Sequence, residues 1–275
     1  MKRQIVLVCM LFGVAFAFAA KVDTLFVESP SMKKEVQVVV VLPDAAQGRK
    51  AVSCPVVYLL HGYGGNAKTW VEIKPNLPQI ADEKGIIFVC PDGKNSWYWD
   101  SPKNPSYRYE TFVSSELVKY IDEHYKTIAN RKGRAITGLS MGGHGALWNA
   151  IRHKDTFGAC GSMSGGVDIR PFPKNWRMSS QLGDIESNKE LWDTHTVVNQ
   201  VDSLQNGDLA ITFDCGENDF FLNVNKDLHK RLLARKIDHD FTTRPGAHNK
   251  TYWKNSIDYH ILFFEKFFKE NEGGK

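Results

Sequence analysis

The 275-residue sequence contains few cysteines, and none of them has the spacing of a metal site. Cys9 lies in an apolar run at the N-terminus, and four others follow at Cys54, Cys90, Cys160 and Cys215. The last three lie within or at the ends of apolar runs, where cysteine usually behaves as a small buried hydrophobic side chain. We therefore expect free thiols in the core rather than disulfides or metal ligands.

The sequence also lacks a strong surplus of charge. It has 35 basic and 31 acidic residues, which gives a formal net charge of +4. Two of the basic residues, Lys2 and Arg3, belong to the extreme N-terminus. No basic block remains that could cover a phosphate backbone, so nucleic acid is not an expected partner.

Only one stretch is both long and apolar, and it lies at the N-terminus. Lys2 and Arg3 precede an apolar run over residues 5–18, which is followed by small residues up to Ala20. This order is typical of a cleaved signal peptide, whereas a membrane anchor needs about 20 apolar residues. The sequence predicts a signal peptide over residues 1–20, export to the periplasm or the extracellular medium, and no membrane attachment after cleavage.

Strand-like and helix-like segments alternate through the rest of the chain. The strand-like runs are rich in Val, Ile and Leu and cover residues 36–43, 55–62, 85–93, 134–140, 157–166 and 209–216. Such runs are expected for parallel strands that are covered on both faces. Helix-period patterns separate them and close the chain. Residues 21–275 are therefore predicted to form a single α/β domain, with a mostly parallel central sheet and helices on both faces.

Residues 167–207 interrupt this alternation. They contain PFPKNW and a short polar helix pattern, but no strand-like run. Because the segment connects two strands, we expect it to lie over their carboxyl ends as a partial cap.

One serine lies between glycines in TGLSMGGHGAL, residues 137–147. The pattern G-x-S-x-G, formed by Gly138, Ser140 and Gly142, follows a strand-like run and precedes a helix-like one, which is the context of a nucleophile elbow. In that turn the strained backbone pushes the hydroxyl out of the sheet, and flanking side chains would collide. Ser140 is the candidate nucleophile.

A serine nucleophile needs a base, and the base needs an orienting acid. In folds with this elbow the chain order is Ser, Asp or Glu, then His, each after a strand. Asp219 follows the run 209–216, and His248 follows the last predicted strand at 238–245; Asp214, in the strand end, is the alternative acid. The other histidines are not expected to act as the base: His229, His239 and His260 lie in helix or strand patterns and are expected to be structural or solvated. His144 and His153 lie on the helix after Ser140 and, by their spacing, point away from it.

Attack on a carbonyl also creates an oxyanion that needs backbone N–H donors. One donor is expected from Met141, which follows the nucleophile. The other is expected from the loop HGYGG (61–65), with Tyr63 as first choice and Gly64 as the alternative. His61 is expected to hold this loop by hydrogen bonds.

Aromatic residues crowd the loop after the run 85–93. Trp97, Trp99 and Tyr107 could form a wall that stacks on a sugar or an aryl acyl group, or they could pack the loop on the domain. Both readings stay open, and these three residues are the candidate substrate contacts.

The motifs LLHGYGGN, TGLSMGGHGAL, DCGEND and PGAHNKTYW occur in this order, and with them the chain resembles the esterase D-like family of α/β-hydrolases over roughly Leu25 to Lys269. That family includes feruloyl and acetyl esterases, S-formylglutathione hydrolases and mycolyltransferases. The resemblance implies a triad of Ser140, Asp219 and His248, and neither cofactor nor metal.

Together these features predict an exported serine esterase that cleaves short acyl or hydroxycinnamoyl esters of carbohydrates. Acyl transfer to a sugar acceptor and a thioesterase activity like that of S-formylglutathione hydrolase are the alternatives. A non-catalytic binding module is disfavoured because the set of catalytic motifs is complete.

Overall fold

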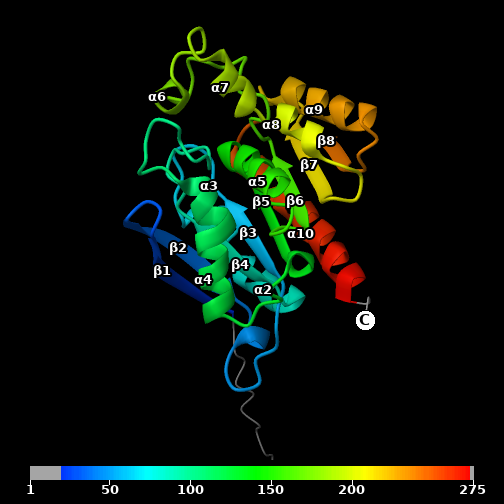
Figure 1. Cartoon of the computed structure of the whole chain (residues 1–275). Coiled ribbons are helices and arrows are strands. Elements are labelled where there is room, and N and C mark those ends of the chain that lie inside the picture. The colour runs from blue at the N-terminus through cyan, green and yellow to red at the C-terminus, as the bar shows by residue number, and fades with distance from the viewer. Residues whose placement is uncertain (1–19, 273–275) are drawn as a thin grey trace, which may run out of the picture.

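The structure is a computed structural model, and residues 20–272 are described (Figure 1). The predicted signal peptide falls outside these residues, apart from Ala20. Within the described residues no helix has the length and apolar character needed to cross a membrane.

Eight strands form one sheet in the order β1-β2-β4-β3-β5-β6-β7-β8. Pairings from β4 through β3 to β8 are parallel, whereas β1 and β2 are antiparallel to their neighbours. The predicted mostly parallel sheet is confirmed. The strands are β1 Lys21–Ser29, β2 Lys34–Leu42, β3 Val56–Leu60, β4 Ile87–Pro91, β5 Arg134–Gly138, β6 Ala159–Met163, β7 Ala210–Gly216 and β8 Asp240–Arg244.

The first edge of the sheet differs from the sequence expectation in two ways. Strand β1 was absent from the predicted runs because its burial alternates and its exposed face carries polar residues. The run at 36–43 was expected to be parallel, but β2 lies antiparallel between β1 and β4. Its last five residues are buried all the same, so its composition matches that of a parallel strand.

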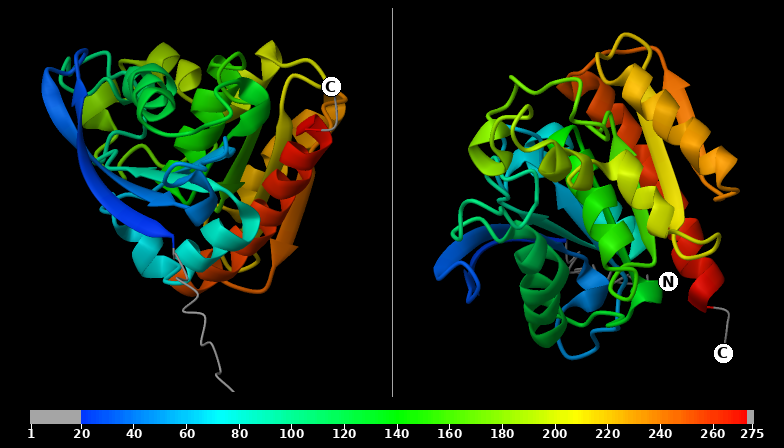
Figure 2. Two further views of the ribbon diagram at one scale, coloured as in Figure 1. Left: turned by 90° about the horizontal axis from the view of Figure 1, so that it is seen from below. Right: turned by 45° about the horizontal axis from the view of Figure 1, so that its top comes forward.

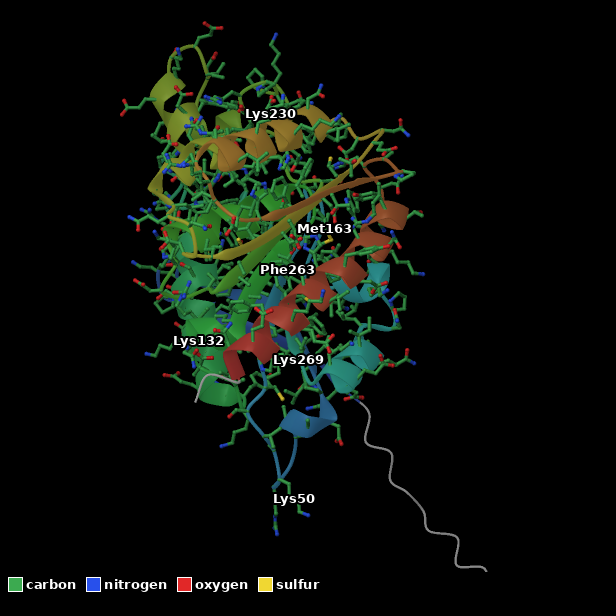
Figure 3. The ribbon with its side chains drawn as sticks, turned by 90° about the vertical axis from the view of Figure 1, so that its right-hand side faces the viewer. Lys50, Lys132, Met163, Lys230, Phe263 and Lys269 are labelled. Carbon is green, nitrogen blue, oxygen red and sulfur yellow. The ribbon has the colours of Figure 1, made fainter. Side chains whose placement is uncertain are left out.

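Helices cover both faces of the sheet (Figure 2). Apolar side chains of α4, α5, α8 and α9 pack in one layer, and those of α1, α2 and α10 pack in the other. Met163 of β6 and Phe263 of α10, labelled in Figure 3, lie in this second layer. The helices are α1 Thr69–Ile73, α2 Leu77–Lys84, α3 Tyr109–Thr111, α4 Leu117–His124, α5 Met141–Arg152, α6 Ser179–Leu182, α7 Lys189–Thr194, α8 Val197–Gln200, α9 Leu222–Ala234 and α10 Lys250–Glu272, with short helical turns at Asp44–Ala46, Phe112–Glu116, Arg131–Gly133 and Val201–Ser203.

Residues 167–207 carry α6, α7 and α8 and contain no strand, as the sequence predicts. In Figure 1 they lie at the top of the molecule, beyond the sheet. The ring of His195 stacks on Trp148 of α5 at 5.3 Å between centroids, which docks the segment on the elbow helix.

The four cysteines of the described residues are buried, in agreement with the sequence, whereas Cys9 lies outside these residues. Cys90, Cys160 and Cys215 form no disulfide among the described residues. Burial raises the pKa of the Cys90 and Cys160 thiols above the ordinary value, so both stay protonated at neutral pH.

Candidate active site

Ser140 occupies a strained turn between β5 and α5. Its backbone has φ 55° and ψ −118°, a conformation that non-glycine residues rarely adopt. A Cβ at Gly138 would overlap the backbone of Gly142, and one at Gly142 would overlap the carbonyl of Leu60. The two flanking glycines therefore give the turn the space it needs, as the elbow motif requires.

His248 connects Ser140 to Asp219. The Oγ of Ser140 lies 2.8 Å from Nε2 of His248, and Nδ1 of His248 lies 2.8 Å from Oδ2 of Asp219. The other carboxylate oxygen of Asp219 accepts the backbone N–H of Phe221 at 2.8 Å. Asp219 is buried, whereas the His248 side chain keeps 15% of its surface exposed. The structure thus brings the three predicted residues together, with the base open to solvent at one side.

Asp214 has different partners. It accepts hydrogen bonds from the side chains of Arg244, Tyr252, Ser256 and His260, and none of the bonds involves His248. Burial alone would raise its pKa, but these hydrogen bonds and the Arg244 charge hold the pKa of Asp214 below the ordinary value. This carboxylate ties β7 to β8 and α10, which is a structural role and not that of the alternative acid.

The hydrogen bonds of the backbone amides near Ser140 distinguish Tyr63 from Gly64, the two candidates for the second oxyanion donor. The N–H of Gly64 donates to Oδ1 of Asn95 at 2.7 Å, so this amide is occupied. Within residues 20–272 the N–H groups of Tyr63 and Met141 have no acceptor. Both remain available to a developing oxyanion, which favours Tyr63 over Gly64.

His61 holds the loop that carries Tyr63. Its Nδ1 lies 2.7 Å from the carbonyl of Gly62, and its Nε2 accepts the N–H of Gly93 at 2.9 Å. The imidazole is thereby used on both sides, in agreement with the structural role predicted for it.

His144 is also structural. It is fully buried on α5, where Nε2 accepts the indole N–H of Trp99 at 2.8 Å and Nδ1 bonds the carbonyl of Gly166. Burial lowers the pKa of His144 to about 3, so the ring is neutral. The other histidines bond elsewhere: His153 to Glu110, His229 to His239 and His260 to Thr137.

A cleft of about 340 Å³ opens at Ser140. The 62–65 loop, polar side chains of α1 and several aromatic side chains form its walls. The lining residues are Gly62, Tyr63, Gly64, Gly65, Asn66, Thr69, Glu72, Ile73, Leu139, Ser140, Trp176, Phe220, His248, Lys250 and Trp253. Among the described residues no group of three or more His, Cys, Asp or Glu side chains is arranged to hold a metal ion.

The predicted substrate contacts at Trp97, Trp99 and Tyr107 require a correction, because none of the three lines the cleft. Trp97 and Trp99 are 1% and 0% exposed and stack on each other at 5.6 Å between centroids. Tyr107 packs edge-on against Tyr109. The structure supports the packing reading of this loop, since the rings of Trp97 and Trp99 pack edge-to-face against His144 of α5 at 5.2 and 5.3 Å between centroids.

Three other aromatic residues line the cleft and were not singled out in the sequence. Trp176 comes from the 167–207 segment, Phe220 directly follows Asp219, and Trp253 lies five positions after His248. Proximity to the predicted acid and base was a usable signal for Phe220 and Trp253. For Trp176 the signal was coarser, because its segment 167–207 was expected to lie over the carboxyl ends of two strands but nothing singled out this side chain as a cleft residue.

The chain is similar to proteins of known family, both in sequence and in fold. A family model described as "Putative esterase" matches residues 29–264. The chain belongs to this esterase family. It is a carboxylic ester hydrolase with the α/β-hydrolase fold, and the resemblance drawn from the motifs is confirmed.

Individual relatives in this family cover nearly the whole chain. An acetyl esterase of Caldicellulosiruptor saccharolyticus is 26% identical over 250 residues, which are 83% of this chain and 92% of the relative. A solved ferulic acid esterase has 29% identity and a TM-score of 0.77, covering 91% of this chain and 100% of that one. The fluorophosphonate-binding serine hydrolase FphF of Staphylococcus aureus shares the fold, with 19% identity, a TM-score of 0.79, and coverage of 90% and 99%.

Proposed function

We propose that the protein cleaves its esters through an acyl-enzyme on Ser140. The observation that carries the proposal is the chain of hydrogen bonds from Asp219 through His248 to Ser140, which ends in an open cleft. As Oγ attacks the carbonyl carbon, its proton moves to Nε2 of His248, and the carbonyl electrons move to oxygen between the amides of Tyr63 and Met141. His248 then donates this proton to the leaving alcohol. In the second half of the reaction His248 takes a proton from a water molecule, which attacks the acyl-enzyme and releases the acid and Ser140.

The substrates that we propose are short acyl or hydroxycinnamoyl esters of carbohydrates. The volume of the cleft, about 340 Å³, suits a small ligand, and Trp176, Phe220 and Trp253 form an aromatic wall on one side of it. Flat aromatic surfaces suit an aryl group or a sugar ring better than a long flexible chain. Two similar proteins, an acetyl esterase and a ferulic acid esterase, support the same acyl groups.

A chain-length series tests this substrate class. Acetyl, feruloyl and decanoyl esters of one sugar alcohol are compared by kcat/KM. We expect the acetyl and feruloyl esters to exceed the decanoyl ester at least tenfold, since the aromatic side of the small cleft suits a small or flat acyl group, and ordering a long flexible chain there costs conformational entropy. A best rate with the decanoyl ester would refute the proposed class, and acylated sugar as the main product would instead favour acyl transfer.

We also propose that the enzyme is exported after removal of residues 1–20. The support is the order of charge, apolar run and small residues in the sequence. Expression of the full chain in a bacterium should deliver a mature protein that begins at Lys21 outside the cytoplasm, as measured by N-terminal sequencing of fractions. An uncleaved N-terminus in the cytoplasm would contradict the proposal, and a variant with Leu11→Arg provides the export-defective control.

A further inference from the structure

Three aromatic rings surround the imidazole of His248. The ring centroid of Phe220 lies 4.3 Å away with 39° between the planes, that of Trp253 5.0 Å away at 90°, and that of Phe221 5.4 Å away at 77°. Phe220 is both the nearest of the three and the least steeply inclined. It therefore presents more of its π face to the imidazole than an edge-on ring would.

Phe220 is poorly placed for an ordinary role in the core. It keeps 53% of its surface exposed, whereas the adjacent Phe221 is 1% exposed. It lines the cleft at Ser140 and stacks on Trp176, with 5.9 Å between centroids and 23° between planes. Because half of the Phe220 side chain is exposed, burial in the core does not account for its position against His248.

We infer that Phe220 is a positioning residue that stabilises the imidazolium form of His248 during catalysis. This inference rests on the proposed function, in which His248 takes the proton of Ser140 as the Oγ–carbon bond forms. A positive charge within about 6 Å of an aromatic ring centroid, over its face, is attracted by the ring quadrupole. The ring thus acts on the transition state, in which the imidazole is charged, more than on the resting state, in which it is neutral.

The other charged or titratable groups around His248 stay the same when only Phe220 changes. Asp219 and Ser140 contact its two ring nitrogens. Lys250 of α10 and Glu72 of α1 line the same cleft, and Arg244 of β8 is bound by Asp214. A Phe220→Leu substitution keeps an apolar side chain and removes the π face, so it isolates the effect of the ring.

The test measures kcat/KM for a short acyl ester from pH 5 to pH 9. In Phe220→Leu we expect the plateau to fall about fivefold, because the charged transition state loses the ring. The same free energy should move the acid limb about 0.7 pH unit lower, because protonation of the base in the free enzyme is also disfavoured. Phe220→Tyr restores the aromatic face and should recover both quantities.

Phe172→Leu is the matched control. Phe172 packs against Phe221 at 5.1 Å between centroids and has no ring contact with His248. This variant should keep the acid limb of the wild type. Two results would overturn the inference: an unmoved acid limb in Phe220→Leu with the loss confined to KM, or a limb moved to higher pH. Fluorophosphonate labelling of Ser140 in the wild type and in Phe220→Leu distinguishes failure of this inference from failure of the proposed function. Failure of the proposed function would abolish labelling in both proteins, whereas failure of the inference alone would leave it intact.

Discussion

Replacing Ser140 with alanine is expected to lower kcat for ester hydrolysis by about 10⁴- to 10⁶-fold. Without Oγ no acyl-enzyme forms, and only the amides of Tyr63 and Met141 and the binding cleft remain to assist water. The substitution keeps the Cβ, so the strained turn between Gly138 and Gly142 is preserved. Thermal unfolding of the variant should therefore match that of the wild type to within a few degrees.

A fluorophosphonate probe offers an independent readout of the same residue. It should label wild-type protein at Ser140, as located by peptide mass spectrometry, and leave the Ser140→Ala variant unlabelled. The control is Ser162→Ala, because Ser162 is buried on β6 and lies outside the cleft. Hydrolysis by the Ser140→Ala variant at a rate near that of the wild type would exclude the assignment.

Substitution of the two candidate acids should separate catalysis from stability. Asp219→Asn is expected to reduce kcat about 10⁴-fold with little change in folding, because an amide cannot stabilise the imidazolium or fix the tautomer of His248. Asp214→Asn removes a buried carboxylate that binds Arg244 and His260. Breaking such a buried pair costs about 3–5 kcal/mol of unfolding free energy, so this variant should lose stability more than turnover.

Denaturant titrations and kcat values measured on the same preparations give this comparison. Stability is compared at neutral pH, where the Asp214 carboxylate, whose pKa lies below the ordinary value, is ionised. If Asp214→Asn were stable yet inactive, and Asp219→Asn active, the orienting role would belong to Asp214 and the contact between Asp219 and His248 would have no catalytic importance.

The sequence by itself determined the local features of this protein. Alternating apolar runs and helix-period segments predicted the α/β sheet, because buried parallel strands and amphipathic helices leave different periods in the chain. Ser140, Asp219 and His248 could be selected from the sequence, since an elbow needs glycines at fixed spacing and its partners follow strands in a fixed order, and in the structure they lie within hydrogen-bond distance of one another.

Tertiary structure decided whatever depended on contacts between distant segments. It separated Asp219 from Asp214, and Tyr63 from Gly64, because only the folded chain shows which carboxylate reaches His248 and which amide is occupied by Asn95. For the aromatic loop, where stacking on a substrate and packing on the domain had both stayed open, it supported packing, because Trp97 and Trp99 are buried and do not line the cleft. Side-chain type alone does not reveal whether a ring faces solvent or neighbouring segments.

The aromatic residues of the cleft show the same limit. Trp176 lies in the 167–207 segment, which contains no strand, yet it shares a cleft with Ser140. Trp97 lies in the loop after β4 but is buried, and its ring contacts His144 of α5 in an edge-to-face arrangement. Spacing along the chain fixes local geometry, whereas burial depends on how distant segments pack, which a single sequence does not encode in any local pattern.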